Sequence, residues 1–206
     1  MWILYWVLLF VLLVVALREI VIYRVNRAVD EMMGAAPEHQ VPKLEQVRNL
    51  KELGITFCTE EEERKFIFDY EANAYYAAHP YYALLTDAGS GELLKNVYAV
   101  SDRECIYDSE YGQILAGLGH ISGLAFTDIS CPDRHQVTYR YQGRKYRWRG
   151  KKNRDWADHR LAASLNRFCK GDKRFFTDNS HEGIIYFFGT RDQAAQLNER
   201  FGLRFR

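Results

Sequence analysis

Residues 136–152 read QVTYRYQGRKYRWRGKK, with apolar and polar side chains alternating on both sides of Gln142-Gly143. A two-residue turn at this point predicts an antiparallel β-hairpin in which Tyr141 faces Arg144. The same register gives four further pairs, namely Arg140 with Lys145, Tyr139 with Tyr146, Thr138 with Arg147, and Val137 with Trp148. Because successive side chains of a strand point to opposite faces, this register separates the aromatic residues from most of the cationic residues.

The two faces of the predicted hairpin have opposite characters. One face carries Val137, Tyr139, Tyr146 and Trp148. Cross-strand aromatic pairs stabilise a hairpin by up to ~1 kcal/mol each, so we expect this face to pack into the core. The other face and its rim carry Arg140, Lys145, Arg147 and Arg149. We expect this second face to meet solvent or an anionic ligand.

The stretch from Arg140 to Arg154 holds eight positive and no negative side chains, which makes it the strongest candidate for a binding surface. The binding residues predicted from it are Arg140, Arg144, Lys145, Arg147, Arg149, Lys151 and Lys152. Such a run is also typical of an ordinary solvated face, here balanced by the acidic region Glu60–Glu71. Anionic lipid and an acidic protein both fit a basic surface. Nucleic acid fits less well, because base stacking needs aromatic rings on the cationic side.

Residues 1–17 read MWILYWVLLFVLLVVAL and contain no charged side chain. At about 1.5 Å per residue, a helix of this length covers roughly 25 Å of a ~30 Å hydrocarbon core, and apolar residues after Arg18-Glu19 extend it. We therefore predict a single transmembrane helix over residues 2–23, continuing as an amphipathic stalk to Met33. A cleavable signal peptide is disfavoured, because no Lys or Arg precedes Leu17 and no A-x-A pattern is present there.

Charges that flank the apolar run predict its orientation. Arg18, Arg24 and Arg27 follow the run, whereas only the α-amine lies on its other side. An excess of Lys and Arg marks the cytoplasmic side, so we expect an inner- or plasma-membrane protein whose C-terminal domain is cytoplasmic. Residues 34–43 contain two prolines and no apolar period, which indicates a linker. The expected organisation is an anchor and stalk over 1–33, a linker over 34–43, and one domain over 44–206.

The rest of the chain mixes helix and strand signals. Helices are predicted at residues 44–53, from Thr59 towards His79, at 155–170, and after the capping box at Thr190. Strands are predicted within residues 93–107, at about 120–129, in the hairpin, at 175–176 and at 183–188. Residues 87–91 have turn chemistry, and the glycine-rich residues 112–123 indicate a loop or a short helix. The predicted fold class is α+β, with one soluble domain of a mostly antiparallel sheet and flanking helices after the transmembrane helix.

No sequence motif indicates a particular reaction. The net charge is +1 and the four cysteines are widely separated without a C-x-x-C pattern, so we predict no metal, no cofactor and no catalytic residue. In a reducing cytoplasm the cysteines are core thiols, whereas a periplasmic domain could pair them. The alternative hypothesis is a membrane-tethered, hydrolase-like enzyme that assembles Asp155, His159 and His181. Asp155 is equally suited to capping the start of its predicted helix.

These features predict a single-pass, membrane-anchored binding or regulatory module without enzymatic activity. Its basic hairpin is expected to contact an acidic protein partner or an anionic membrane surface. This description suits a regulatory subunit, or an inhibitor or immunity-type protein that acts at the membrane.

Overall fold

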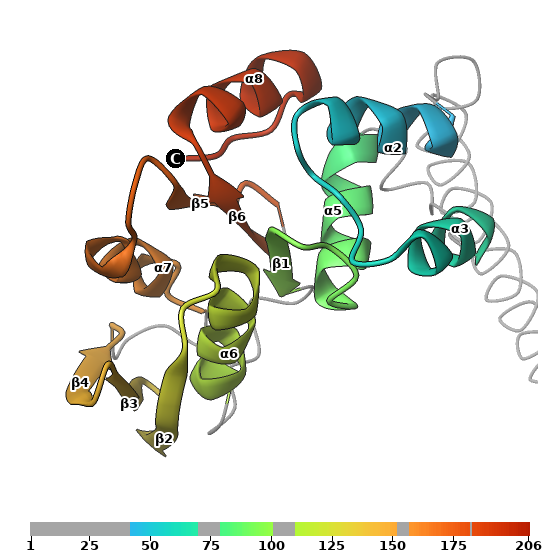
Figure 1. Cartoon of the computed structure of the whole chain (residues 1–206). Helices are drawn as coiled ribbons and strands as arrows, with labels where there is room; N and C mark the ends of the chain where they lie inside the picture. Colours follow the sequence, from blue (N-terminus) through green and yellow to red (C-terminus); the bar gives the residue numbers. More distant parts are fainter. Residues whose placement is uncertain (1–41, 70–78, 101–109, 152–156, 182) are drawn as a thin grey trace, which may run out of the picture. The chain divides into compact units, whose positions relative to one another are not determined.

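The computed structural model describes residues 42–69, 79–100, 110–151, 157–181 and 183–206 (Figure 1). These residues belong to one compact unit, which comprises Val41–Ala72 and His79–Arg206. They form an α+β domain with antiparallel sheets and flanking helices, as the sequence predicts. The predicted transmembrane helix and stalk lie outside the described residues. Within the described ranges, no helix combines the length and the apolar composition needed to cross a bilayer.

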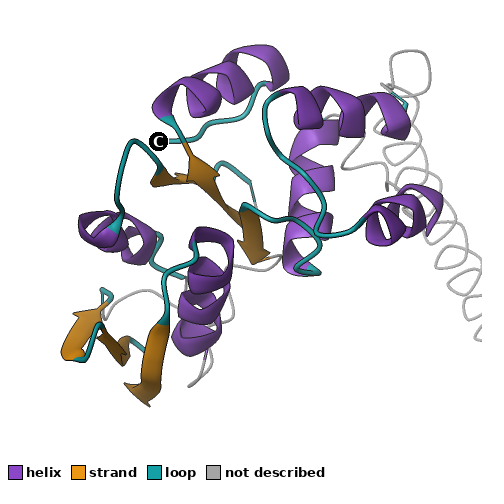
Figure 2. Cartoon of the chain, viewed as in Figure 1, coloured by secondary structure: helices purple, strands orange, loops and turns teal. Residues whose placement is uncertain are grey.

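Helices and strands alternate along the domain in an irregular order (Figure 2). The helices are α2 (Lys43–Glu52), α3 (Glu60–Asp69), α5 (Pro80–Ser90), α6 (Glu110–Ser122), α7 (Arg160–Leu165), the short 3-10 helix η1 (Asn166–Phe168) and α8 (Arg191–Phe201). The strands are β1 (Val97–Val100), β2 (Phe126–Asp133), β3 (Gln136–Tyr141), β4 (Arg144–Arg149), β5 (Arg174–Asp178) and β6 (Ile184–Gly189).

The described strands form two three-stranded sheets, which corrects the expectation of a single sheet. One sheet has the order β1-β6-β5 and the other has the order β2-β3-β4, and every pairing is antiparallel. The sequence pattern identified the hairpin but could not show that its sheet ends at β4 on one side and at β2 on the other. Alternation fixes which residues face each other within a hairpin, whereas the choice of further strand partners depends on contacts distant in the sequence.

Strand β6 is buried on both faces and supplies side chains to two separate hydrophobic clusters. Ile185 and Phe187 point into a cluster formed with α2, α5, β1 and α8. Ile184 and Tyr186 point into a second cluster formed with α6, β3, α7 and β5. A strand that is buried on both faces needs apolar side chains at consecutive positions, which explains the sequence IIYFF at residues 184–188.

Helix α5 extends through residues that the sequence analysis assigned to a turn. The first four residues of the DAGSG segment complete α5, which ends at Ser90 with Gly91 as its C-cap. A methyl group on Gly89 would lie 3.0 Å from the Ala99 side chain, so the glycine allows α5 to pack closely on β1. Gly89 therefore serves helix-to-sheet packing, and burial of Leu84 and Leu85 overrides the local turn preference.

The glycine-rich segment forms helix α6, which agrees with the helical option left open by the sequence. The strand after it begins at Phe126, several residues later than expected, because α6 continues to Ser122. A methyl group on Gly117 would lie only 2.4 Å from the Tyr98 ring. The glycine at this position lets α6 lie directly on the tyrosine of β1.

We predict that Gly117→Ala lowers the stability of the domain. Alanine favours a helix by about 1 kcal/mol over glycine, but overpacking against a fixed ring costs about 1–3 kcal/mol. Thermal unfolding of the full-length protein in a neutral detergent, followed by circular dichroism, measures the change. In a Tyr98→Val background the same substitution should instead stabilise, because the ring is gone. Equal effects in both backgrounds would contradict the packing role of Gly117.

Candidate binding face on the basic hairpin

The predicted β3–β4 hairpin is present with every predicted pair. Tyr141 faces Arg144 across the turn, Val137 faces Trp148, and the ladder ends with a further pair, Gln136 with Arg149. Gln142 and Gly143 have φ angles of 49° and 76°, as a two-residue turn of this kind requires. The turn residues and the alternation therefore predict the register of this hairpin correctly.

The aromatic face of the hairpin packs against η1 and α6. The Tyr139 and Tyr146 rings stack with centroids 5.7 Å apart, and Tyr146 also lies 4.9 Å from the Phe168 ring. Trp148 packs against Tyr111 of α6 with centroids 4.9 Å apart. Val137 and Tyr139 are buried, so this face belongs to the core as predicted. Packing at several points along β4 fixes the direction in which its opposite face points.

Two of the predicted binding residues make ion pairs with strand β2. Arg140 lies 2.8 Å from the Asp128 carboxylate, and Arg149 lies 2.9 Å from the Asp133 carboxylate. The backbone N–H of His135, helped by Arg149, holds the pKa of Asp133 below its usual value. Nearby acidic residues of β2 thus partly balance the basic face.

The acidic region Glu60–Glu71, which the sequence suggested as a balance for the basic hairpin, forms its described ion pair with helix α2 instead. Glu63 of α3 binds Lys51 of α2 at 2.9 Å, and Thr59 accepts a hydrogen bond from the Glu62 backbone N–H at the start of α3. The pattern Thr-Glu-Glu-Glu at residues 59–62 predicts a capping box, and the bond that Thr59 accepts confirms one half of it. On the other side, the Glu62 carboxylate accepts from the Thr59 hydroxyl, where a full capping box would use the backbone N–H.

Four of the predicted binding residues form what we call the open cationic patch: Arg144, Lys145, Arg147 and Lys151. All four are exposed, and none forms an ion pair with another residue that the structure describes. Lys152, the remaining predicted binding residue, lies outside the described residues. The patch follows β4 and continues just beyond its end, so it is held by the packed hairpin.

Asp158 secures the end of β4, a role that the sequence did not reveal. Its carboxylate accepts from the Lys151 backbone N–H at 3.3 Å and from the Arg160 Nε at 2.8 Å. Its own backbone N–H donates to the Tyr111 hydroxyl at 2.8 Å. The Asp158 side chain therefore links the hairpin end to the start of α7, while its backbone links to α6.

The titration properties of this junction follow from its surroundings. Burial acts to raise the pKa of Asp158, but hydrogen bonds from Arg160 and from the Lys151 backbone outweigh it and lower that pKa. Burial raises the pKa of Tyr111 to about 12. At neutral pH the junction thus consists of an Asp158 carboxylate facing an arginine, beside a neutral Tyr111.

The two described residues of the alternative enzymatic hypothesis, His159 and His181, lie near the β5–β6 turn or within it. His159 Nδ1 is 3.2 Å from the Asn179 side-chain nitrogen, and Asn179 accepts from Arg206 at 2.7 Å. The His181 ring packs 4.2 Å from the His79 ring, while Asp155 lies outside the described residues. The structure thus brings the segment around His159 next to the 178–181 turn, although no sequence pattern predicted this. In the described part of the chain, no three His, Cys, Asp or Glu side chains group as metal ligands.

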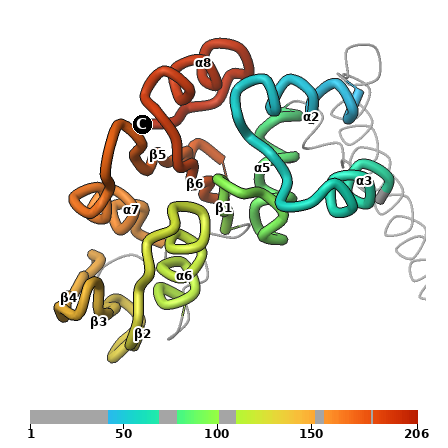
Figure 3. The backbone as a smooth tube through the Cα atoms, in the orientation of Figure 1, coloured from blue at the N-terminus to red at the C-terminus, as the bar shows by residue number. Residues whose placement is uncertain are grey.

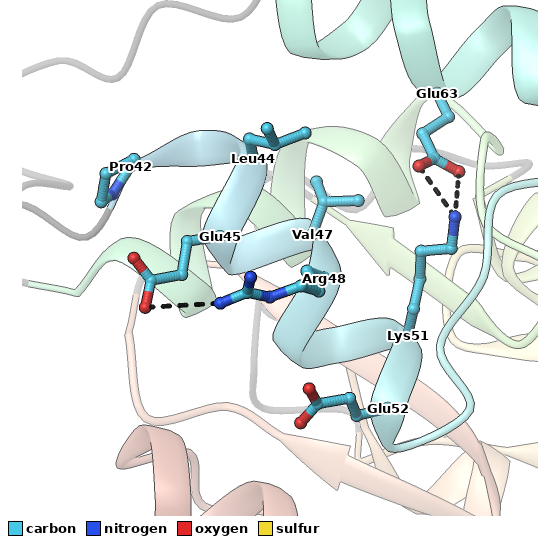
Figure 4. Close-up of a pocket in the computed structure, with 8 residues that line it drawn as sticks. All are labelled: Pro42, Leu44, Glu45, Val47, Arg48, Lys51, Glu52 and Glu63. Atoms are coloured by element: carbon cyan, nitrogen blue, oxygen red, sulfur yellow. Dashed lines mark hydrogen bonds and ion pairs between the residues drawn. The ribbon is translucent and has the colours of Figure 1, made fainter.

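A pocket of about 570 Å³ lies along α2 (Figure 4). Its charged side chains pair with one another or with α8. Lys51 binds Glu63 at 2.9 Å, and Glu52 binds Arg200 at 3.0 Å. The lining residues include no histidine, cysteine or hydroxyl side chain. This pocket therefore offers no group suited to nucleophilic or acid–base chemistry beyond paired carboxylates.

Three of the four cysteines lie in the described part of the chain, and none of these three forms a disulfide bond. Cys58, Cys131 and Cys169 are partly buried, and Cys105 lies outside the described residues. Burial raises the pKa of each of these three thiols. They are therefore protonated thiols at neutral pH.

Comparisons with family models, curated proteins and solved structures found no match to this chain. Function is therefore inferred from the charge, register and exposure of the chain's own residues. Among the features described above, the open cationic patch combines a rigid position with side chains available to a ligand.

We predict that Asp158→Asn destabilises the protein at pH 7 by about 1–3 kcal/mol, the usual cost of breaking a buried charged hydrogen-bond network. Because the folded-state pKa is lowered, the carboxylate contributes stability above its unfolded pKa of about 3.9 and loses it as pH falls through the folded value. Chemical unfolding of the detergent-solubilised protein between pH 2 and 7 measures the difference.

The exposed Asp172→Asn variant serves as the control, and it should unfold like the parent protein throughout. The difference in the free energy of unfolding between Asp158→Asn and the parent protein should vanish at the lowest pH of the series. A difference in unfolding free energy that stays constant with pH would contradict the role assigned to the ionised carboxylate of Asp158.

Proposed function

We propose that this protein is a single-pass, membrane-anchored binding module without enzymatic activity, and that its basic hairpin contacts an acidic protein partner. One observation carries the proposal. Arg144, Lys145 and Arg147 are exposed on a packed strand and form no ion pair with another described residue, while neighbouring Arg140 and Arg149 are paired. The fold thus leaves a specific subset of its cations available.

The rigidity of the hairpin favours a protein ligand. Stacking of Tyr146 on Tyr139 and packing of Trp148 on Tyr111 hold β4 in place before any partner arrives. A partner that finds side chains already positioned loses less conformational freedom on binding. Arginine also pairs with carboxylates in a bidentate geometry and is enriched among residues that dominate binding energy.

The size of each contact shows why several cations must act together. An exposed ion pair contributes only about 0–1 kcal/mol because water screens it. Three or four such contacts, brought together at an interface that excludes water, give a useful affinity. The proposal therefore requires a partner surface with several carboxylates spaced to match the patch.

The predicted membrane anchor would compensate for the low affinity of the basic hairpin by keeping the domain near partners at the same membrane. A linker of ten residues reaches at most about 35 Å, so the domain would stay close to the cytoplasmic side of its membrane. Confinement raises the effective concentration of a partner at the same membrane. This arrangement suits a regulatory subunit, or an inhibitor or immunity-type protein.

An anionic membrane surface is the second candidate ligand. Arg144 and Lys145 lie beside the hairpin turn and are exposed, so they could reach lipid headgroups. A basic residue near such a surface contributes about 1 kcal/mol. Nucleic acid fits the structure less well, because Tyr146 and Trp148 pack on the core side of the sheet and offer no stacking platform beside the cations.

We predict that the triple variant Arg144→Glu, Lys145→Glu, Arg147→Glu loses the partner. The test is affinity capture of the full-length protein from solubilised membranes at low and raised salt, with mass spectrometry of the captured proteins. Reversing three charges should reduce recovery of a specific acidic protein at least tenfold, since each contact changes from attraction to repulsion. Raised salt should reduce recovery by the parent protein as well.

A matched control reverses three exposed cations elsewhere on the domain: Lys65→Glu, Lys170→Glu and Arg191→Glu. This control should retain the partner. Equal losses in both triple variants would point to net charge and contradict a role for the hairpin. Loss of binding to vesicles of anionic lipid, with no protein captured, would favour the membrane surface instead.

A further inference from the structure

Strand β4 forms an open edge of its sheet. The order β2-β3-β4 leaves the outer side of β4 without a partner among the described strands (Figure 3). Its six pairs with β3 run without any shift in register. A regular edge strand presents a row of backbone N–H and C=O groups to which another strand can add.

The edges formed by β2 and β5 differ from β4 in ways that discourage strand addition. Strand β2 has two register shifts and contains Asp128 with a φ of 50°, so its edge is irregular. Strand β5 has its outer side occupied, because Thr177 and Arg206 exchange backbone hydrogen bonds of 3.1 and 3.2 Å. The basic hairpin thus combines an open, regular edge with the open cationic patch.

One hydrogen bond fixes which backbone groups of β4 face outward. The Gly150 backbone N–H donates to the His135 carbonyl at 2.8 Å, so this pair is a hydrogen-bonded pair. Hydrogen-bonded and non-hydrogen-bonded pairs alternate in an antiparallel ladder. Trp148 and Tyr146 therefore bond to β3, and the intervening residues direct their N–H and C=O groups away from it. These outward-facing residues are Lys145, Arg147 and Arg149.

The same three residues carry the exposed cations. Lys145 and Arg147 belong to the open cationic patch, and Arg149 pairs with Asp133 while its side chain stays half exposed. Each outward-facing backbone position along β4 thus lies beside a positive side chain. Every second residue of β4 thus offers both an outward-facing backbone N–H and C=O and a positive side chain.

We propose that the acidic partner binds as an extended segment that adds to β4 as a fourth strand of this sheet. Its backbone would bond to Lys145, Arg147 and Arg149, and its carboxylates would lie opposite their side chains. This inference rests on the function proposed above and defines the partner segment: acidic residues at alternate positions, separated by single apolar residues. The apolar residues would lie on the side of Tyr146 and Trp148, both of which are partly exposed.

Charge selects this occupant over a second copy of the chain. Two β4 edges brought together would place Lys145 and Arg147 of one copy against the same cations of the other. Like charges directly opposite each other destabilise a strand pair. Positive side chains on an edge therefore oppose self-association, while they favour an acidic strand.

The test measures binding of labelled peptides to the full-length protein in neutral detergent at low salt, by fluorescence anisotropy. The first peptide has the core Glu-Val-Glu-Val-Glu-Val-Glu, and its isomer has the same composition with the four glutamates adjacent. We expect the alternating peptide to bind at least tenfold more tightly. N-methylation at the positions that face β4 should abolish this advantage, while N-methylation at the intervening positions should preserve it.

A charge exchange tests the register. Arg147→Glu should weaken binding of the alternating peptide at least tenfold. Replacing by lysine one of the two inner glutamates of that peptide, the one that lies opposite position 147, should restore binding. Equal binding of both isomers, without an effect of N-methylation, would overturn strand addition. The remaining contact would be purely electrostatic, and the proposed function would still stand. Failure of every acidic peptide to bind at low salt would overturn the acidic-partner function itself.

Discussion

Burial of β6 on both faces is the constraint on which the rest of the domain depends. Alternate residues of this one strand enter two hydrophobic clusters, with Ile185 and Phe187 on one side and Ile184 and Tyr186 on the other. Each side must be covered, and different helices cover them: α5 and α8 on the first side, α6 and α7 on the second. The Tyr186 hydroxyl is buried and has no hydrogen-bond partner among the described residues.

The candidate binding face depends on this arrangement through α6. The second cluster holds α6 against β6, and Tyr111 of α6 packs on Trp148 of the hairpin. The Asp158 backbone N–H then joins the Tyr111 hydroxyl, and its carboxylate joins the end of β4. A chain of packed and bonded groups thus leads from the central strand to the cationic strand. The cations are exposed, but the backbone that carries them is fixed.

Features set by neighbouring residues could be predicted from the sequence. The hairpin register and the last helix follow from local signals, because the Gln142-Gly143 turn and the capping box at Thr190 act within a few residues. The Thr190 side chain and Gln193 make both bonds of that capping box, and Gly202 ends the helix in a left-handed conformation. All predicted binding residues within the described ranges are exposed. The alternation predicts this exposure for Arg140, Lys145, Arg147 and Arg149.

Features set by distant contacts could not be predicted. Gly89 and Gly117 resemble loop residues until β1 is placed against their helices. The pairing of Arg140 with Asp128 depends on β2 joining the hairpin, which the local pattern does not encode. Asp158 becomes a junction only once α6 and β4 meet, so sequence reasoning placed the emphasis on Asp155 instead. In each case a close approach between segments far apart in the chain decides the role.

Photocrosslinking from position 147 of the full-length protein in its native membrane tests the central claim most directly. A photoreactive amino acid in place of Arg147 should form a discrete protein adduct that weakens at raised salt, while the same probe in place of the exposed Arg191 should not. A lipid adduct alone, or equal protein adducts from both positions, would contradict the account that the open cationic patch binds an acidic protein.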